Sequence, residues 1–159
     1  MKGQQKMKIS VMGIEYNQLL SGKALAEMGN EVTYISKDHK RIENIKRGYY
    51  NADEAMVIKS MGSKETFDFS ADIKKALQNT NMCFISEGID ANDEEQLEAV
   101  LDRAKIVGEN MDSHMFIIDR STKSPSRAMQ IKETIEKELK KRNKNLTFEV
   151  IANPNFLKI

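Results

Sequence analysis

The sequence has few of the residues that build disulfide frameworks and metal centres. Its 159 residues include one cysteine, Cys83, and two histidines, His39 and His114. One cysteine excludes an internal disulfide framework and a cysteine-rich zinc site, because both need several thiols. Two histidines argue against a histidine-based metal site. We therefore expect a protein without a structural disulfide and without a metal ion.

The sequence also lacks an excess of charge and a long apolar run. Lys and Arg number 25, Asp and Glu number 24, and the formal net charge is +1. This balance gives no general attraction to nucleic acid or to an anionic membrane. No apolar run reaches the roughly 18 residues that a membrane span needs, and the polar residues 1–6 lack the apolar segment of a signal peptide. We expect a cytoplasmic protein with a disordered leader over 1–6.

Strand-like and helix-like segments alternate along the rest of the chain. Hydrophobic residues make up 40% of it, enough for one domain with a buried core. Short apolar or β-branched runs predict strands over 8–13, 31–35, 65–69, 82–86, 115–118 and 146–151. The segments between them predict helices over 16–28, 38–47, 52–61, 71–77, 93–107 and 125–142, with Ser70 as the N-cap of the fourth.

This order of elements predicts an α/β fold. Strands that are apolar on both sides must be covered on both sides. We therefore expect a doubly wound parallel sheet of about six strands with helices on both faces, as one Rossmann-like domain over 7–159.

The first predicted strand ends in a glycine and leads directly into a helix, as in Rossmann domains that bind a dinucleotide. Their motif is G-x-G-x-x-G, whose glycines allow a tight turn, close approach to the pyrophosphate and close helix packing. Here the segment is Gly13-Ile14-Glu15-Tyr16-Asn17-Gln18. Only the first glycine is present, so the motif by itself does not predict a dinucleotide site.

Five segments, in order, match the landmarks of one enzyme family. They are Met7-Lys-Ile-Ser-Val-Met-Gly13 with Tyr16, Leu20 to Thr33, Phe84-Ile-Ser-Glu-Gly-Ile-Asp90, Arg120-Ser-Thr-Lys-Ser-Pro-Ser126, and Asn153-Pro-Asn-Phe-Leu157. They resemble the NAD-binding domain of the UDP-glucose/GDP-mannose dehydrogenase family. The resemblance implies an N-terminal Rossmann-like domain of an oxidoreductase that oxidises a sugar C6 alcohol twice, with two NAD.

The resemblance also implies which residues surround the two ligands. On the cofactor side these are Gly13, Ile14, Glu15, Tyr16, Ser36, Lys37, Arg41, Gly88, Ser121 and Thr122. On the substrate side they are Asn153, Asn155, Phe156 and Leu157. Thr122 resembles a family residue near the nicotinamide and the catalytic water, and it also fits a strand-end threonine that bonds the local backbone.

The chain departs from the family at four of its functional positions. Glu15 would place a carboxylate beside the pyrophosphate, and like charges about 4 Å apart repel by about 4 kcal/mol at an effective dielectric constant of 20. Gln18 adds bulk where a glycine is usual. Ser36 replaces the acid that binds the ribose, and Asn155 replaces a glutamate, although an amide cannot act as a general base. These departures predict weakened cofactor binding.

The charged segment after the second predicted strand leaves two interpretations open. Ser36 is followed by Lys37, with Lys40 and Arg41 close behind. Cations without the ribose-binding acid can accommodate the 2′-phosphate of NADP. The same residues also fit a solvated, charged helix start. Of the two cofactors, the resemblance favours NAD.

The resemblance also limits what this chain can do alone. The family's catalytic cysteine lies in a C-terminal sugar-binding domain, and its dimers form through a central helix. We expect this chain to contain neither, and we expect Cys83 to be a small apolar core residue. We therefore expect no catalytic residues here, and we leave a homodimer and a protein partner as open expectations. Two alternatives stay open, namely a degenerate Rossmann module kept for protein contacts or regulation, and a domain shifted to NADP or another nucleotide.

Overall fold

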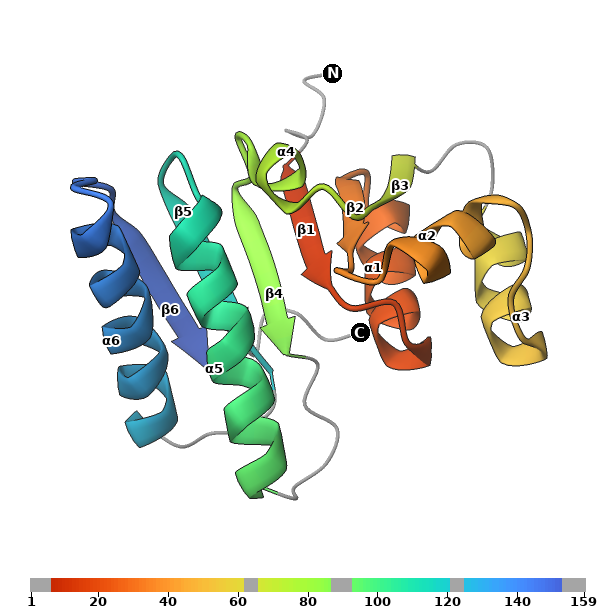
Figure 1. Ribbon diagram of the computed structural model, residues 1–159. Coiled ribbons are helices and arrows are strands. Elements are labelled where there is room, and N and C mark those ends of the chain that lie inside the picture. The colour runs from red at the N-terminus through yellow and green to blue at the C-terminus, as the bar shows by residue number, and fades with distance from the viewer. Residues whose placement is uncertain (1–6, 62–65, 87–92, 121–124, 153–159) are drawn as a thin grey trace.

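Strands alternate with helices along the chain, and two successive helices separate the second strand from the third (Figure 1). The computed structural model describes residues 7–61, 66–86, 93–120 and 125–152. The strands are β1 (Lys8–Met12), β2 (Glu31–Ile35), β3 (Thr66–Ser70), β4 (Met82–Ser86), β5 (Met115–Asp119) and β6 (Phe148–Ala152). The helices are α1 (Tyr16–Glu27), α2 (His39–Lys46), α3 (Ala52–Ser60), α4 (Ile73–Leu77), α5 (Asp93–Asn110) and α6 (Pro125–Lys141).

The six strands form one parallel sheet in the order β3-β2-β1-β4-β5-β6. The chain winds outward from β1 to β3, crosses back, and then winds outward from β4 to β6. The strand order therefore reverses between β1 and β4. In open α/β sheets, ligands bind outside the carboxyl ends of the strands at this reversal. The predicted doubly wound parallel sheet is confirmed.

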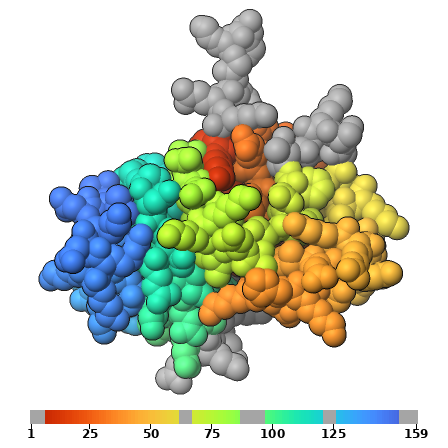
Figure 2. Space-filling model, turned by 45° about the horizontal axis from the view of Figure 1, so that its top comes forward, coloured from red at the N-terminus to blue at the C-terminus, as the bar shows by residue number. Residues whose placement is uncertain are grey.

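Helices cover both faces of the sheet, and each face has its own apolar core. On one face α1, α2 and α3 pack over the β1–β3 half. On the other, α4, α5 and α6 lie side by side (Figure 2). Strand β1 contributes to both cores, because successive side chains point to opposite faces. Ile9 and Val11 belong to the first core and Met12 to the second.

Most predicted elements agree with the observed ones to within a residue or two at each end. The N-cap predicted for the fourth helix is wrong. Ser70 ends β3, and Asp72 caps α4 by accepting a hydrogen bond from Lys75 N at 3.1 Å. Ser70 Oγ instead accepts from Asp72 N at 3.1 Å. The serine therefore makes a local turn before the helix, and the aspartate takes the capping position that its carboxylate favours.

Helix α1 approaches β2 closely at Gly22. The buried Tyr34 hydroxyl of β2 donates a hydrogen bond to Leu19 O at 2.8 Å. A Cβ atom on Gly22 would lie 2.2 Å from the same hydroxyl oxygen. Position 22 therefore has no room for a side chain, and the close contact holds α1 against β2.

Candidate cofactor site

A cavity of about 240 Å³ opens at the carboxyl ends of β1 and β2. Its lining consists of Met12, Gly13, Ile14, Glu15, Ile35, Ser36, Lys37, Ile73, Arg103 and Ile106. Five of the cofactor residues predicted from the sequence are in this group, from two strand ends that are 23 residues apart. The volume is below the roughly 300–1,000 Å³ of whole ligand pockets, so the cavity suits one part of a dinucleotide.

The turn between β1 and α1 forms one wall of this cavity. Gly13 has φ +124°, a conformation that side chains rarely adopt, and its N–H donates to Ile35 O at 2.8 Å. Ile14 is buried, whereas Glu15, the N-cap of α1, and Tyr16 are exposed. The first glycine of the motif thus makes the expected tight turn and ties it to the end of β2.

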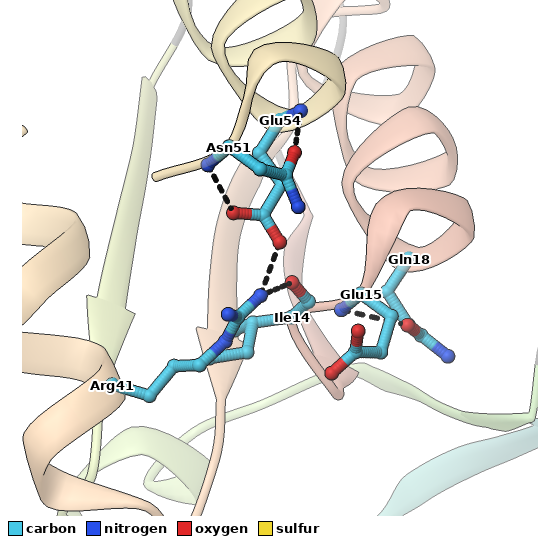
Figure 3. Close-up of polar contacts among 6 residues, drawn as sticks. All are labelled: Ile14, Glu15, Gln18, Arg41, Asn51 and Glu54. Atoms are coloured by element: carbon cyan, nitrogen blue, oxygen red, sulfur yellow. Dashed lines mark hydrogen bonds and ion pairs between the residues drawn. The ribbon is translucent and has the colours of Figure 1, made fainter. Parts of the chain in front are cut away.

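The Gln18 side chain folds back over this turn (Figure 3). Its Oε1 accepts a hydrogen bond from Glu15 N at 3.0 Å. A Cβ atom on Gly13 would lie 2.9 Å from Gln18 Cδ. The residue at the third glycine position therefore occupies the turn instead of leaving it open.

Arg41 joins three segments behind the turn (Figure 3). Its Nη2 donates to Ile14 O at 3.3 Å and forms an ion pair with Glu54 Oε2. Glu54 Oε1 accepts from Asn51 N at 3.2 Å, and Asn51 Oδ1 accepts from Glu54 N at 2.8 Å. The start of α3 is thus connected through α2 to the turn after β1.

This network corrects one interpretation of the charged segment after β2. Asp38, His39 and Lys40 are exposed, as a solvated helix start would be. Arg41 is not part of such a start, because its guanidinium pairs with a buried carboxylate. Ser36 Oγ accepts from Asp38 N at 3.1 Å. Of the cations in this segment, Lys37 lines the cavity.

Seven predicted site residues lie outside the described part of the chain. They are Gly88, Ser121, Thr122, Asn153, Asn155, Phe156 and Leu157. Their roles beside the nicotinamide and the sugar stay predictions, as does the leader over 1–6.

Two polar residues of this region were not found from the sequence. Glu54 had a local signal, because Asn51 and Glu54 have the spacing of a capping box, and that pair is present in α3. Arg103 had none. It reaches the cavity from α5, and its Nη1 donates to Ile85 O at 2.9 Å. Only the packing of α5 against β4 brings it there.

The predicted site residues do not extend to the other features of the described residues. A larger hollow of about 760 Å³ lies between α6 and β6 and contains none of the predicted site residues. Within 7–61, 66–86, 93–120 and 125–152, no group of three or more metal-binding side chains occurs. None of the described helices is long and apolar enough to cross a membrane.

Cys83 is expected to be unreactive in the folded protein. It lies fully buried in β4, as predicted, and burial raises the pKa of its thiol from 9.0 to about 12. The thiolate is the reactive form, so a raised pKa keeps the thiol protonated throughout the neutral range. Ellman's reagent at about pH 8 should leave Cys83 unmodified in native protein and modify it fully in denaturant. Rapid modification of the native protein would contradict this.

Comparison with known proteins links the chain to one enzyme family. The family model for the UDP-glucose/GDP-mannose dehydrogenase family, NAD binding domain, matches residues 7–159. UDP-glucose 6-dehydrogenase TuaD of Bacillus subtilis is 28% identical over 156 residues, which cover 95% of this chain and 33% of that protein. The UDP-glucose 6-dehydrogenase of Pseudomonas aeruginosa is 26% identical over 157 residues, covering 96% and 35%. The chain spans about a third of the length of these relatives.

Solved structures show the same fold. A UDP-glucose dehydrogenase from the hyperthermophilic archaeon Pyrobaculum islandicum superposes with a TM-score of 0.74 at 20% identity, covering 99% of this chain and 38% of that one. A GDP-mannose dehydrogenase from Pseudomonas aeruginosa gives a TM-score of 0.68 at 20% identity, covering 92% and 35%. Since the family model matches nearly the whole sequence, the chain belongs to the UDP-glucose/GDP-mannose dehydrogenase family, as its NAD-binding domain.

Proposed function

We propose that this chain is the cofactor-binding part of a nucleotide-sugar dehydrogenase and holds NAD at the carboxyl ends of β1 and β2. One observation carries the proposal. Five residues predicted to contact the cofactor line a single cavity beside the strand-order reversal, where α/β sheets bind nucleotides. Family membership supports NAD as the cofactor.

The cavity fits the adenosine end of NAD better than its pyrophosphate. Ile35, Ile73 and Ile106 provide apolar walls that suit an adenine ring. Ser36 and Lys37 provide the polar groups that would bind the ribose. The place for the pyrophosphate, at the start of α1, holds the Gln18 side chain.

The reaction belongs to the whole protein in this proposal. When bound, NAD supplies a hydride acceptor for the oxidation of a sugar alcohol. The described residues contribute the binding and orientation of the adenosine end. Because the chain spans about a third of its relatives, we propose that it is not catalytically competent by itself. A cytoplasmic location, self-association and a protein partner stay predictions.

A cofactor-free module kept for protein contacts is the second candidate. Two observations favour it. Glu15 and Gln18 occupy the turn between β1 and α1, where the pyrophosphate would bind and which we call the phosphate turn. Helix α1 and its C-cap residue also expose apolar side chains, with Leu20 39% and Met28 56% exposed. Exposed apolar groups on one helix are compatible with a protein interface.

A thermal-shift titration distinguishes the two candidates. NAD at about 100 times its dissociation constant should stabilise the fold by about 2.7 kcal/mol, which raises the melting temperature of a protein of this size by roughly 5–10 °C. The variant Ser36→Tyr, which fills the cavity, should abolish the shift. The control Ser113→Tyr lies just before the amino end of β5, at the other end of the strands from the cavity, and it should retain the shift.

Three other results would change the assignment. No shift with NAD, NADH or NADP in a cooperatively unfolding sample favours the protein-contact module. A shift that persists in Ser36→Tyr places the cofactor elsewhere. A shift with NADP alone indicates a site for the 2′-phosphate at Lys37.

A further inference from the structure

We propose that Gln18 is an internal competitor of the cofactor's pyrophosphate, and that its displacement limits the affinity of this domain for dinucleotides. The inference rests on the proposed function, because it assumes that the adenosine end of NAD enters the cavity beside β1 and β2. Gln18 would then set how strongly the pyrophosphate part of the cofactor binds.

The first turn of α1 is where a pyrophosphate is attracted. The leading N–H groups of a helix have no partner within the helix, and the helix dipole favours negative charge there. In this chain the N–H of Glu15 already has a partner, because Gln18 Oε1 accepts from it at 3.0 Å (Figure 3). A phosphate oxygen can accept from this N–H only after the Gln18 amide has moved away.

The same side chain also fills the space above Gly13. A Cβ atom on Gly13 would lie 2.9 Å from Gln18 Cδ, 3.0 Å from Cγ and 3.3 Å from Nε2. The first glycine of the motif makes the tight turn, and the second lets the backbone approach the pyrophosphate. In this chain the space over the tight turn holds the Gln18 side chain. Gln18 therefore occupies the N–H of Glu15, to which a phosphate oxygen would otherwise bind, and it also fills the space over the turn between β1 and α1.

The block is weak enough for a ligand to remove. Between the described residues, the Gln18 side chain makes one hydrogen bond, to Glu15 N. It is half-buried on the first turn of an otherwise intact helix. The net contribution of one hydrogen bond corresponds to about a threefold to tenfold change in an equilibrium constant. We therefore expect Gln18 to weaken dinucleotide binding by about this factor rather than to abolish it.

Isothermal titration calorimetry of NAD and of adenosine tests the inference, since adenosine lacks the pyrophosphate. Gln18→Gly and Gln18→Ala both remove the amide, and the alanine variant keeps a good helix former in α1. Both should lower the dissociation constant for NAD about threefold to tenfold and leave that for adenosine unchanged. The control Asn17→Ala, an exposed neighbour on the same turn, should change neither.

Gln18→Glu extends the test with nearly the same shape. Glutamate keeps a side-chain acceptor for Glu15 N and adds a charge that repels phosphate, so it should weaken NAD binding and spare adenosine.

Two results overturn the inference while the proposed function stands. In the first, wild type binds NAD and adenosine, but neither Gln18→Gly nor Gln18→Ala binds NAD more tightly than Asn17→Ala. In the second, the affinity for adenosine rises as much as that for NAD, which means that the side chain acts outside the pyrophosphate site. If no variant binds NAD or adenosine although all unfold cooperatively, the proposed function fails and the role of Gln18 fails with it.

Discussion

Replacing Arg41 by methionine is expected to lower the free energy of unfolding by about 2–4 kcal/mol, because Glu54 would lose its cation inside the protein. The Glu54 side chain is 3% exposed, and that of Arg41 is 32% exposed. Removing one partner of a fully buried ion pair costs about 3–5 kcal/mol. The partial exposure of Arg41 lets water screen the remaining charge and reduces the cost.

Urea denaturation with two further variants separates the ion pair from general effects of losing an arginine. Arg47→Met removes an exposed pair, in which Arg47 and Glu43 are 66% and 65% exposed, and should cost less than about 1 kcal/mol. The double variant Arg41→Met, Glu54→Leu should recover much of the loss, because it leaves no buried charge unpaired. If Arg41→Met is no more destabilising than Arg47→Met, the pair does not stabilise the fold.

Replacing Gly22 by alanine is expected to cost about 3–5 kcal/mol and to lower the melting temperature by roughly 10 °C. The new Cβ would lie 2.2 Å from the hydroxyl oxygen of Tyr34 and 2.4 Å from its Cζ. Tyr34 is fully buried, and it stacks on Phe69 with 5.1 Å between ring centroids. Either α1 moves off the sheet or the hydroxyl loses its bond to Leu19 O, and both outcomes are destabilising.

Gly48 provides the matched control for thermal unfolding. It has φ +89°, and a Cβ there would meet nothing within 4 Å. Gly48→Ala should therefore lower the free energy of unfolding by only about 1–2 kcal/mol, the cost of placing a side chain in the left-handed backbone conformation. Adding Tyr34→Phe to Gly22→Ala should recover only part of the loss, because the ring carbons stay within contact distance. Equal effects of the two glycine substitutions would show that the contact with Tyr34 is unimportant.

The fold could be read from the sequence because its signals are local. The β-branched run at 31–35 and the apolar run at 82–86 become β2 and β4 with the predicted bounds. Strands apolar on both sides require cover on both faces, and two separate cores provide it. The predicted start of α4 failed because two polar residues, Ser70 and Asp72, could compete for one cap.

The candidate site was only partly predictable. The resemblance identified Gly13, Ser36 and Lys37, and the structure brings them to one cavity. It treated Gln18 as added bulk, whereas the side chain satisfies a backbone N–H of the phosphate turn. It left Arg41 as a cofactor or surface residue and gave no indication of the ion pair that Arg41 forms with Glu54. For Gln18 and Arg41 the sequence gives the polar side chain, but it does not give the hydrogen-bond or ion-pair partner.

By itself, the sequence determined the order of strands and helices, the parallel sheet, the family and the positions where cofactor residues had changed. These follow from hydrophobic periodicity, glycine positions and short motifs, which depend on neighbouring residues. Only the tertiary structure decided that Gln18 covers the phosphate turn, that Arg41 joins α2 and α3 to that turn, and that Arg103 enters the cavity. The direction of a polar side chain depends on which donors and acceptors the folded chain brings within reach.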